Sequence, residues 1–168
     1  MPHFAGVLPY AHDAAGDVHF LLGREHWGKE AGAWSGFAGK CETCDGGDAL
    51  RTAAREAFEE SCGMLGSSED LCNILAARAR VFRAATGTHY LLPFQFNAYL
   101  PVMFQGVQAA IRTAAGSAAN RFLEKDAVAW YPLAGLRSGE CSILLRGGFR
   151  ADLENLARAI SPATCASP

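Results

Sequence analysis

Three glutamates in one short stretch are the residues of this sequence best suited to metal chemistry. Glu56, Glu59 and Glu60 stand at positions i, i+3 and i+4, so a helix here would bring their carboxylates to one face. Like charges at this spacing destabilise an isolated helix, whereas a hard divalent cation such as Mg²⁺ would neutralise them. The same spacing is also typical of a solvated acidic surface, and spacing alone leaves both interpretations open.

The flanking residues predict the helix that such a site requires. The face opposite the carboxylates is apolar and carries Leu50, Ala54, Ala57 and Phe58. Asp48 can cap the first turn, and Gly63 follows where a left-handed residue commonly ends a helix. The stretch 53–63 is therefore the centre of the predicted helix and of the candidate site.

A strand-like segment broken by glycine, residues 34–42, and a turn-rich loop, residues 43–47, precede this helix. Strand, glycine loop and acid-lined helix together resemble the Nudix box, G-x5-E-x7-R-E-U-x-E-E-x-G-U. Gly39 resembles its opening glycine, Arg55-Glu56 its R-E pair and Glu59-Glu60 its E-E pair.

The sequence departs from this pattern on both sides of the helix. The loop before the helix is two residues longer, and its mid-loop Glu is missing, with Gly47 or Asp48 near its place. Cys62 is one extra residue between the last glutamate and Gly63. These departures concern the loop and the helix exit and leave the three helical carboxylates in place.

The resemblance implies an α/β (α+β) fold, a Nudix-type α/β/α sandwich with a mixed central sheet. It also implies a Mg²⁺ or Mn²⁺ ion held by Glu56, Glu59 and Glu60, with the backbone carbonyl of Gly39 as a further oxygen ligand. Arg55 would brace the carboxylates. The implied reaction is hydrolysis of a phosphoanhydride bond in a nucleoside diphosphate linked to another moiety.

A later segment, residues 122–136, resembles the part of Nudix proteins in which an acid precedes a strand ending in Trp-x-Pro-Leu. Glu124 and Asp126 are the acids here, and some family members use a late acid in catalysis. The alternative is solvated loop charge around Lys125. The general base is therefore one of the helical glutamates or Glu124.

Four residues are candidates for substrate binding. Trp27 lies in a polar loop, where it can stack on a base or cap the edge of the core. Lys40, Arg80 and Arg83 can contact phosphate or remain solvated surface charges.

The whole chain has the composition of one folded domain spanning residues 1–168, with 161–168 as a flexible tail. Half of the 168 residues are hydrophobic and the net charge is −2. We therefore expect no basic surface that binds nucleic acid, and among nucleic acids only a capped RNA end remains a candidate partner. No signal-like start or apolar run of about 18 residues is present, which predicts a cytoplasmic protein without a membrane partner. Monomer and homodimer both remain open.

Six cysteines in a cytoplasmic chain are expected to be free thiols. Cys41 and Cys44 form a C-x-x-C pair, which Cys62 and Cys72 could extend to a zinc site. The sequence leaves both possibilities open.

Further elements follow from hydrophobic periodicity. We predict strands over 4–10, 18–22, 77–84 and 90–99, helices over 101–115 and 149–160, a helix or loop at 71–76 and a loop over 116–120. A second function also fits the altered loop, namely a catalytically weak or inactive Nudix-fold module that binds a nucleotide or protein partner.

Overall fold

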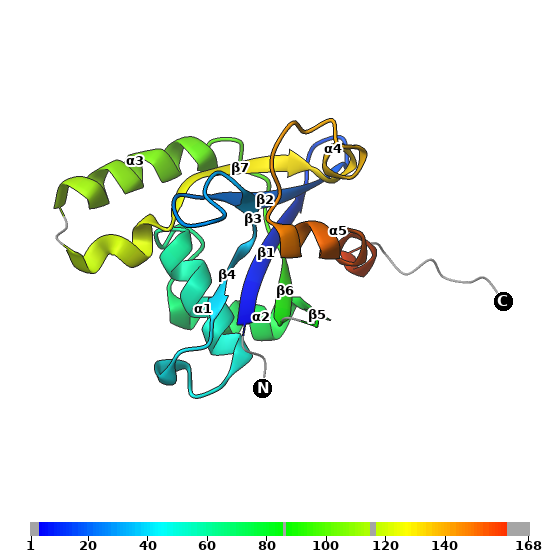
Figure 1. The fold of residues 1–168 in the computed structure, drawn as a ribbon. Helices are drawn as coiled ribbons and strands as arrows, with labels where there is room; N and C mark the ends of the chain where they lie inside the picture. Colours follow the sequence, from blue (N-terminus) through cyan, green and yellow to red (C-terminus); the bar gives the residue numbers. More distant parts are fainter. Residues whose placement is uncertain (1–3, 86, 115–116, 161–168) are drawn as a thin grey trace.

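The structure is a computed structural model that describes residues 4–85, 87–114 and 117–160 (Figure 1). Its strands are β1 (Phe4–His12), β2 (Val18–Glu25), β3 (Trp34–Ser35), β4 (Phe37–Lys40), β5 (Arg80–Arg83), β6 (Thr88–Pro93) and β7 (Lys125–Pro132). Its helices are α1 (Ala49–Glu60), α2 (Ser68–Arg78), α3 (Leu100–Ala114), α4 (Leu133–Ser138) and α5 (Gly147–Ile160), with 3₁₀ turns η1 (Thr43–Asp45) and η2 (Ser117–Leu123). The predicted tail, 161–168, lies outside the described residues.

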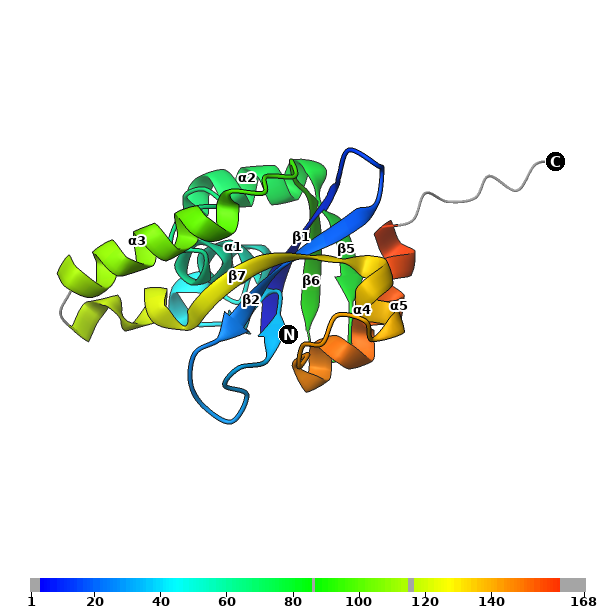
Figure 2. The same ribbon diagram turned by 90° about the horizontal axis from the view of Figure 1, so that it is seen from above.

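The strands form one seven-stranded mixed sheet in which β3-β2-β1-β6-β5 are neighbours, while β4 also pairs with β1 and β7 with β2. β1 and β6 run parallel, whereas the other pairs are antiparallel. Helices α1, α2 and α3 cover one face of the sheet, and α4 and α5 cover the other (Figure 2). The predicted α/β/α sandwich with a mixed sheet is confirmed.

Each face of the sheet has its own apolar core, because successive strand residues point to opposite sides. Val7 packs with α1 and α2, whereas its neighbour Leu8 packs with α5. β4 lies unusually close to β1, since a Cβ on Gly6 would fall 2.1 Å from the Cβ of Ala38. The pairing of the two strands, from Phe4 opposite Lys40 to Val7 opposite Phe37, holds β4 in place directly before the loop that leads to α1.

Helix α1 begins as predicted but ends differently. The Asp48 side chain accepts a hydrogen bond from the Leu50 N–H at 2.8 Å, so it is the N-cap. At the exit Cys62, with φ 55°, is the left-handed residue that closes the helix, and the Gly63 N–H bonds the Phe58 carbonyl at 2.7 Å. Gly63, the residue predicted to end the helix, also has a positive φ, 75°. It lies one position after Cys62, which ends the helix instead.

Two predicted strands were too long. Residues 77 and 78 belong to α2, which Ser67 caps, and β5 covers 80–83 alone. β6 ends at Pro93, and the alternation of polar and apolar residues over 94–97 lies in irregular chain. A period of two over so few residues carries little information, and the backbone pairing of β6 stops before it.

The remaining elements match the prediction in part. Helix α3 corresponds to the helix predicted over 101–115, and α5 to that over 149–160. Residues 117–120 form part of η2 instead of the predicted loop, and α4 was not predicted. No helix in the described part of the chain is long and apolar enough to cross a membrane.

Candidate active site

A hollow of about 470 Å³ opens beside α1 and β4. All three glutamates of α1 line it, together with Gly39 and Glu124. Four cations, Lys40, Arg55, Arg121 and Arg146, also belong to its wall. We call this space the acidic hollow.

The three glutamates are not a solvated surface. Glu56, Glu59 and Glu60 are 7%, 9% and 2% exposed. Burial raises the pKa of Glu56 to about 7, because the charged form loses its hydration, and it raises the pKa of Glu60 as well. Buried carboxylates of this kind need a positive charge to remain ionised.

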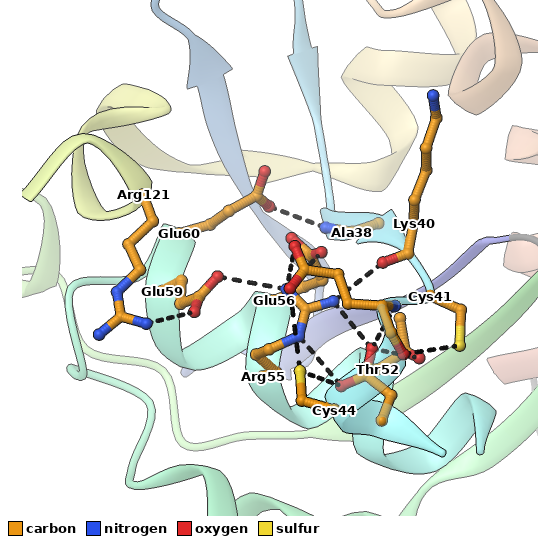
Figure 3. A network of polar contacts seen from close by, with 12 residues as sticks. Ala38, Lys40, Cys41, Cys44, Thr52, Arg55, Glu56, Glu59, Glu60 and Arg121 are labelled. Carbon is orange, nitrogen blue, oxygen red and sulfur yellow. Dashed lines mark hydrogen bonds and ion pairs between the residues drawn. The ribbon is translucent and has the colours of Figure 1, made fainter. Parts of the chain in front are cut away.

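Arg55 supplies positive charge to this cluster (Figure 3). Its Nη1 contacts Glu56 Oε1 at 2.8 Å and Glu59 Oε2 at 3.3 Å. Its Nε and Nη2 donate to the two carboxylate oxygens of Asp45 at 3.0 and 2.9 Å, and Nη2 also donates to the Lys40 carbonyl at 2.9 Å. The guanidinium is therefore anchored on the loop and presents one nitrogen to the glutamates.

Asp45 was missed by the sequence analysis, which took the mid-loop acid to be absent. Asp45 is the sixth residue after Gly39, the place that the pattern gives to its Glu. It is 3% exposed and holds Arg55 as a bidentate partner. The two extra loop residues therefore fall after the acid, in the turn where Gly46 and Gly47 have φ 63° and 78°.

Gly39 packs directly against the cluster. A Cβ at this position would lie 2.2 Å from Glu56 Oε1, so the carboxylate occupies the space of the missing side chain. One residue earlier, the Ala38 N–H donates to Glu60 Oε2 at 2.7 Å. The backbone of β4 thus fixes two of the three carboxylates.

A buried lysine, also missed by the sequence analysis, completes the network. Lys125 is 0% exposed, and its Nζ contacts Glu25 Oε1 and lies 3.4 Å from Glu60 Oε1. Nζ also lies 3.2 Å from the Ser35 hydroxyl, which donates to Glu25 at 3.0 Å. The sequence did carry a signal for this lysine, because it lies in a strand of otherwise mostly apolar residues. A charged side chain in such a strand is buried only when it has partners of opposite charge, so acidic partners were to be expected.

These residues fit a hard divalent cation in their chemistry. The donors are carboxylates and a backbone carbonyl, the oxygen ligands that Mg²⁺ and Mn²⁺ prefer. Within the described residues no three His, Cys, Asp or Glu side chains converge closely enough to enclose an ion, and Arg55 stands between Glu56 and Glu59. A bound cation would therefore replace the Arg55 contacts to the glutamates, while Asp45 retains the guanidinium.

The two acids of the later segment, Glu124 and Asp126, have different surroundings. Glu124 lines the acidic hollow, is exposed, and forms no hydrogen bond or ion pair through its side chain with any residue that the structure describes. Asp126 instead pairs with Arg24 at 2.7 Å and His26 at 3.4 Å.

Of the four residues predicted to bind substrate, two line the acidic hollow and two do not. Trp27 is 46% exposed and lines the hollow, so it does not cap the core edge. Its ring contacts that of His26, with centroids 4.9 Å apart and planes inclined at 54°. Lys40 lines the hollow, but its amino group points away from the carboxylates (Figure 3). Arg80 and Arg83 lie on the edge strand β5 and do not line the hollow.

Two cations in the hollow, Arg121 and Arg146, were not predicted. Arg121 of η2 lies 3.3 Å from Glu59 Oε1, and its guanidinium stands 5.0 Å from the Phe122 ring centroid. The sequence carries little signal for it, because only the chain path between α3 and β7 brings η2 to α1. The five described cysteines are free, and Cys165 lies outside the described residues.

No family model matches this sequence, and no curated protein is significantly similar to it. Solved structures are similar in fold. The Nudix domain of Shewanella oneidensis NrtR, complexed with ADP ribose, superposes with a TM-score of 0.55 at 13% identity, covering 92% of this chain and 84% of that one.

Two further structures match at a TM-score of 0.50. A Nudix hydrolase from Alicyclobacillus acidocaldarius is 18% identical over 92% of this chain and 90% of its own. The bifunctional NMN adenylyltransferase/ADP ribose pyrophosphatase of Francisella tularensis, complexed with AMP and a Mn ion, is 20% identical over 92% of this chain and 42% of its own. With its mixed sheet, its covering helices and these structural neighbours, the chain has the fold of the Nudix hydrolases.

Proposed function

We propose that this protein is a Nudix-type, divalent-metal-dependent hydrolase that cleaves a phosphoanhydride bond in a nucleoside diphosphate linked to another moiety. The observation that carries the proposal is the set of three buried carboxylates on α1, turned toward an open hollow with cations in its wall. Mg²⁺ or Mn²⁺ is the cofactor that suits these oxygen donors.

Glu56, Glu59 and Glu60 would hold the metal together with the carbonyl of Gly39. When bound, the ion neutralises phosphate charge and lowers the pKa of a water molecule. The protein's own part is to fix the carboxylates. The Ala38 N–H orients Glu60, and Arg55 stays attached to Asp45 beside the site.

Glu124 is the best candidate for the general base. Each of the three α1 glutamates is already engaged by Arg55, Arg121, Lys125 or a backbone N–H, whereas Glu124 has no such partner among the described residues. Its carboxylate can therefore accept a proton from an attacking water without leaving a metal or an ion pair. Lys40, Arg121 and Arg146 line the hollow and would contact the phosphates.

The decisive experiment measures phosphate or nucleotide release from ADP-ribose, dinucleoside polyphosphates and nucleotide sugars with Mg²⁺ or Mn²⁺. Glu59→Gln and Glu60→Gln should abolish turnover while the circular dichroism spectrum is retained. Glu154→Gln is the matched control, because Glu154 lines a different pocket and pairs with Arg137 at 2.8 Å. Absence of turnover on every substrate with either metal would refute the enzyme.

One observation favours the second function, a module without turnover. The loop that leads into α1 is two residues longer than the Nudix pattern, with Gly46 and Gly47 in its inserted turn. Such a module should be stabilised against heat by ADP-ribose alone, with no product formed and no further effect of Mn²⁺. Turnover that depends on Mn²⁺ and is lost in Glu59→Gln excludes it.

A further inference from the structure

A second pocket, of about 390 Å³, adjoins the acidic hollow on the α5 side of the sheet. The two spaces share Phe4, Ala38, Lys40 and Arg146 in their walls. A volume of this size lies within the roughly 300–1,000 Å³ of small-molecule sites. A ligand that reaches the α1 glutamates can therefore extend into this space, which we call the α5 pocket.

The α5 pocket has an apolar body. Leu8 and Phe149, 1% and 7% exposed, form its wall with Phe4. Arg146 stands at the junction of the two spaces, with its guanidinium 5.8 Å from the Phe4 ring centroid and its Nη1 3.4 Å from Glu25 Oε1. Apolar walls with a cation at the mouth suit a flat ring attached to a phosphate.

Glu30 and Ser35 also line this pocket, but they are engaged by Arg146 and Glu25. Two further polar side chains enter the lining from different elements. His89 comes from β6 and Asp152 from α5. Neither forms a hydrogen bond or an ion pair through its side chain with a residue that the structure describes, although the charge of Asp152 acts on His89. Burial lowers the pKa of His89, so its neutral ring offers one donor and one acceptor.

Unpaired polar groups in an apolar pocket determine which ring it accepts, because a ligand must satisfy them. The Asp152 carboxylate can only accept hydrogen bonds. Guanine presents two adjacent N–H donors, at N1 and N2, along one edge. Adenine presents one donor beside a ring-nitrogen acceptor, and a carboxylate repels that acceptor.

We propose that the α5 pocket binds the base of the substrate nucleotide and that Asp152 selects a guanine-type base. The inference rests on the proposed function, which places the diphosphate in the acidic hollow. Asp152 accepts from N1–H and N2–H, and the apolar wall contacts the ring faces. Arg146 and Lys40 face the phosphates at the junction.

The test is the binding of GMP and of AMP by titration calorimetry without divalent metal, so that the result does not depend on turnover. We expect GMP to bind about tenfold or more tightly than AMP, the size expected of a bidentate base contact. Asp152→Asn should weaken GMP binding by about the same factor and reduce the preference, because the amide offers one donor and one acceptor. Glu154→Gln removes a carboxylate from the same helix outside this pocket and should leave both affinities unchanged.

Equal binding of GMP and AMP, no binding of either, or an unchanged preference in Asp152→Asn would each overturn the assignment. The outcome is separable from that of the enzyme. Turnover of diphosphates with no base preference would leave the hydrolase standing and remove the base pocket. Selective GMP binding without turnover would support the base pocket and refute the hydrolase.

Discussion

The acidic hollow and the α5 pocket share part of a wall, yet their polar residues are arranged in opposite ways. In the hollow nearly every charged side chain has a partner of opposite charge. The ion pairs of Arg55 with Asp45 and of Lys125 with Glu60 are examples. In the α5 pocket the side chains of His89 and Asp152 have no hydrogen-bond or ion-pair partner among the described residues.

The difference separates charges that position a site from polar groups that meet a ligand. A buried ion pair costs several kcal/mol in desolvation, and its loss leaves an uncompensated charge. An unpaired group at an open pocket stays hydrated until a ligand replaces the water. Substitutions in the hollow should therefore reduce stability, whereas substitutions in the α5 pocket should change binding alone.

The largest contrast is expected between Lys125 and His89. Lys125→Met leaves the buried Glu60 without its cation and leaves Glu25 with Arg146 alone, so it should lower the free energy of unfolding by about 3–5 kcal/mol. The His89 side chain forms no hydrogen bond or ion pair with a residue that the structure describes, so His89→Gln should cost under about 1 kcal/mol. Urea denaturation of both variants measures the two values.

Adding Glu25→Gln to Lys125→Met should recover part of the loss, because it removes one of the two carboxylates that Lys125 contacts. If Lys125→Met and His89→Gln lower the free energy of unfolding equally, the buried network contributes no more to stability than an unpaired side chain.

A smaller contrast is expected between two glycines. A Cβ on Gly39 would lie 2.2 Å from the Glu56 carboxylate, whereas a Cβ on Gly148 meets nothing within 4 Å. The Glu56 side chain can move, so Gly39→Ala should still fold, but its turnover should fall about 10- to 100-fold, as when a group that positions a ligand is lost. Gly148→Ala should be neutral or stabilise α5 by up to about 1 kcal/mol. Undiminished turnover in Gly39→Ala would contradict the contact.

The smallest contrast concerns two aspartates and pH. Hydrogen bonds from Arg55 chiefly lower the pKa of Asp45 to about 2, from 3.8. Since the folded-state pKa is the lower one, this carboxylate stabilises the fold above about pH 4, and the contribution of at most about 2 kcal/mol is lost as the pH falls toward 2. Asp45→Asn should lose it at neutral pH, and Asp152→Asn should not. Urea denaturation at pH 6 and pH 3 compares them, and identical pH dependence in Asp45→Asn and the unsubstituted protein would refute the linkage.

The sequence predicted those features that depend on neighbours along the chain. The i, i+3, i+4 spacing put three glutamates on one face of α1, and Asp48 marked its start. It failed where the signal was local but weak. A short alternation over 94–97 suggested a strand that β6 does not continue, and a loop acid two residues before Gly47 was not recognised as the partner of Arg55.

The sequence by itself determined the acid-bearing helix, the glycine beside it and the Nudix-type resemblance, because helical periodicity and turn chemistry are encoded within a few residues. The tertiary structure alone decided that the carboxylates are buried, that Lys125 reaches Glu60, and that His89 and Asp152 face one pocket. Those pairs are far apart in the chain, and only the packing of β7, β6 and α5 onto the sheet brings them together.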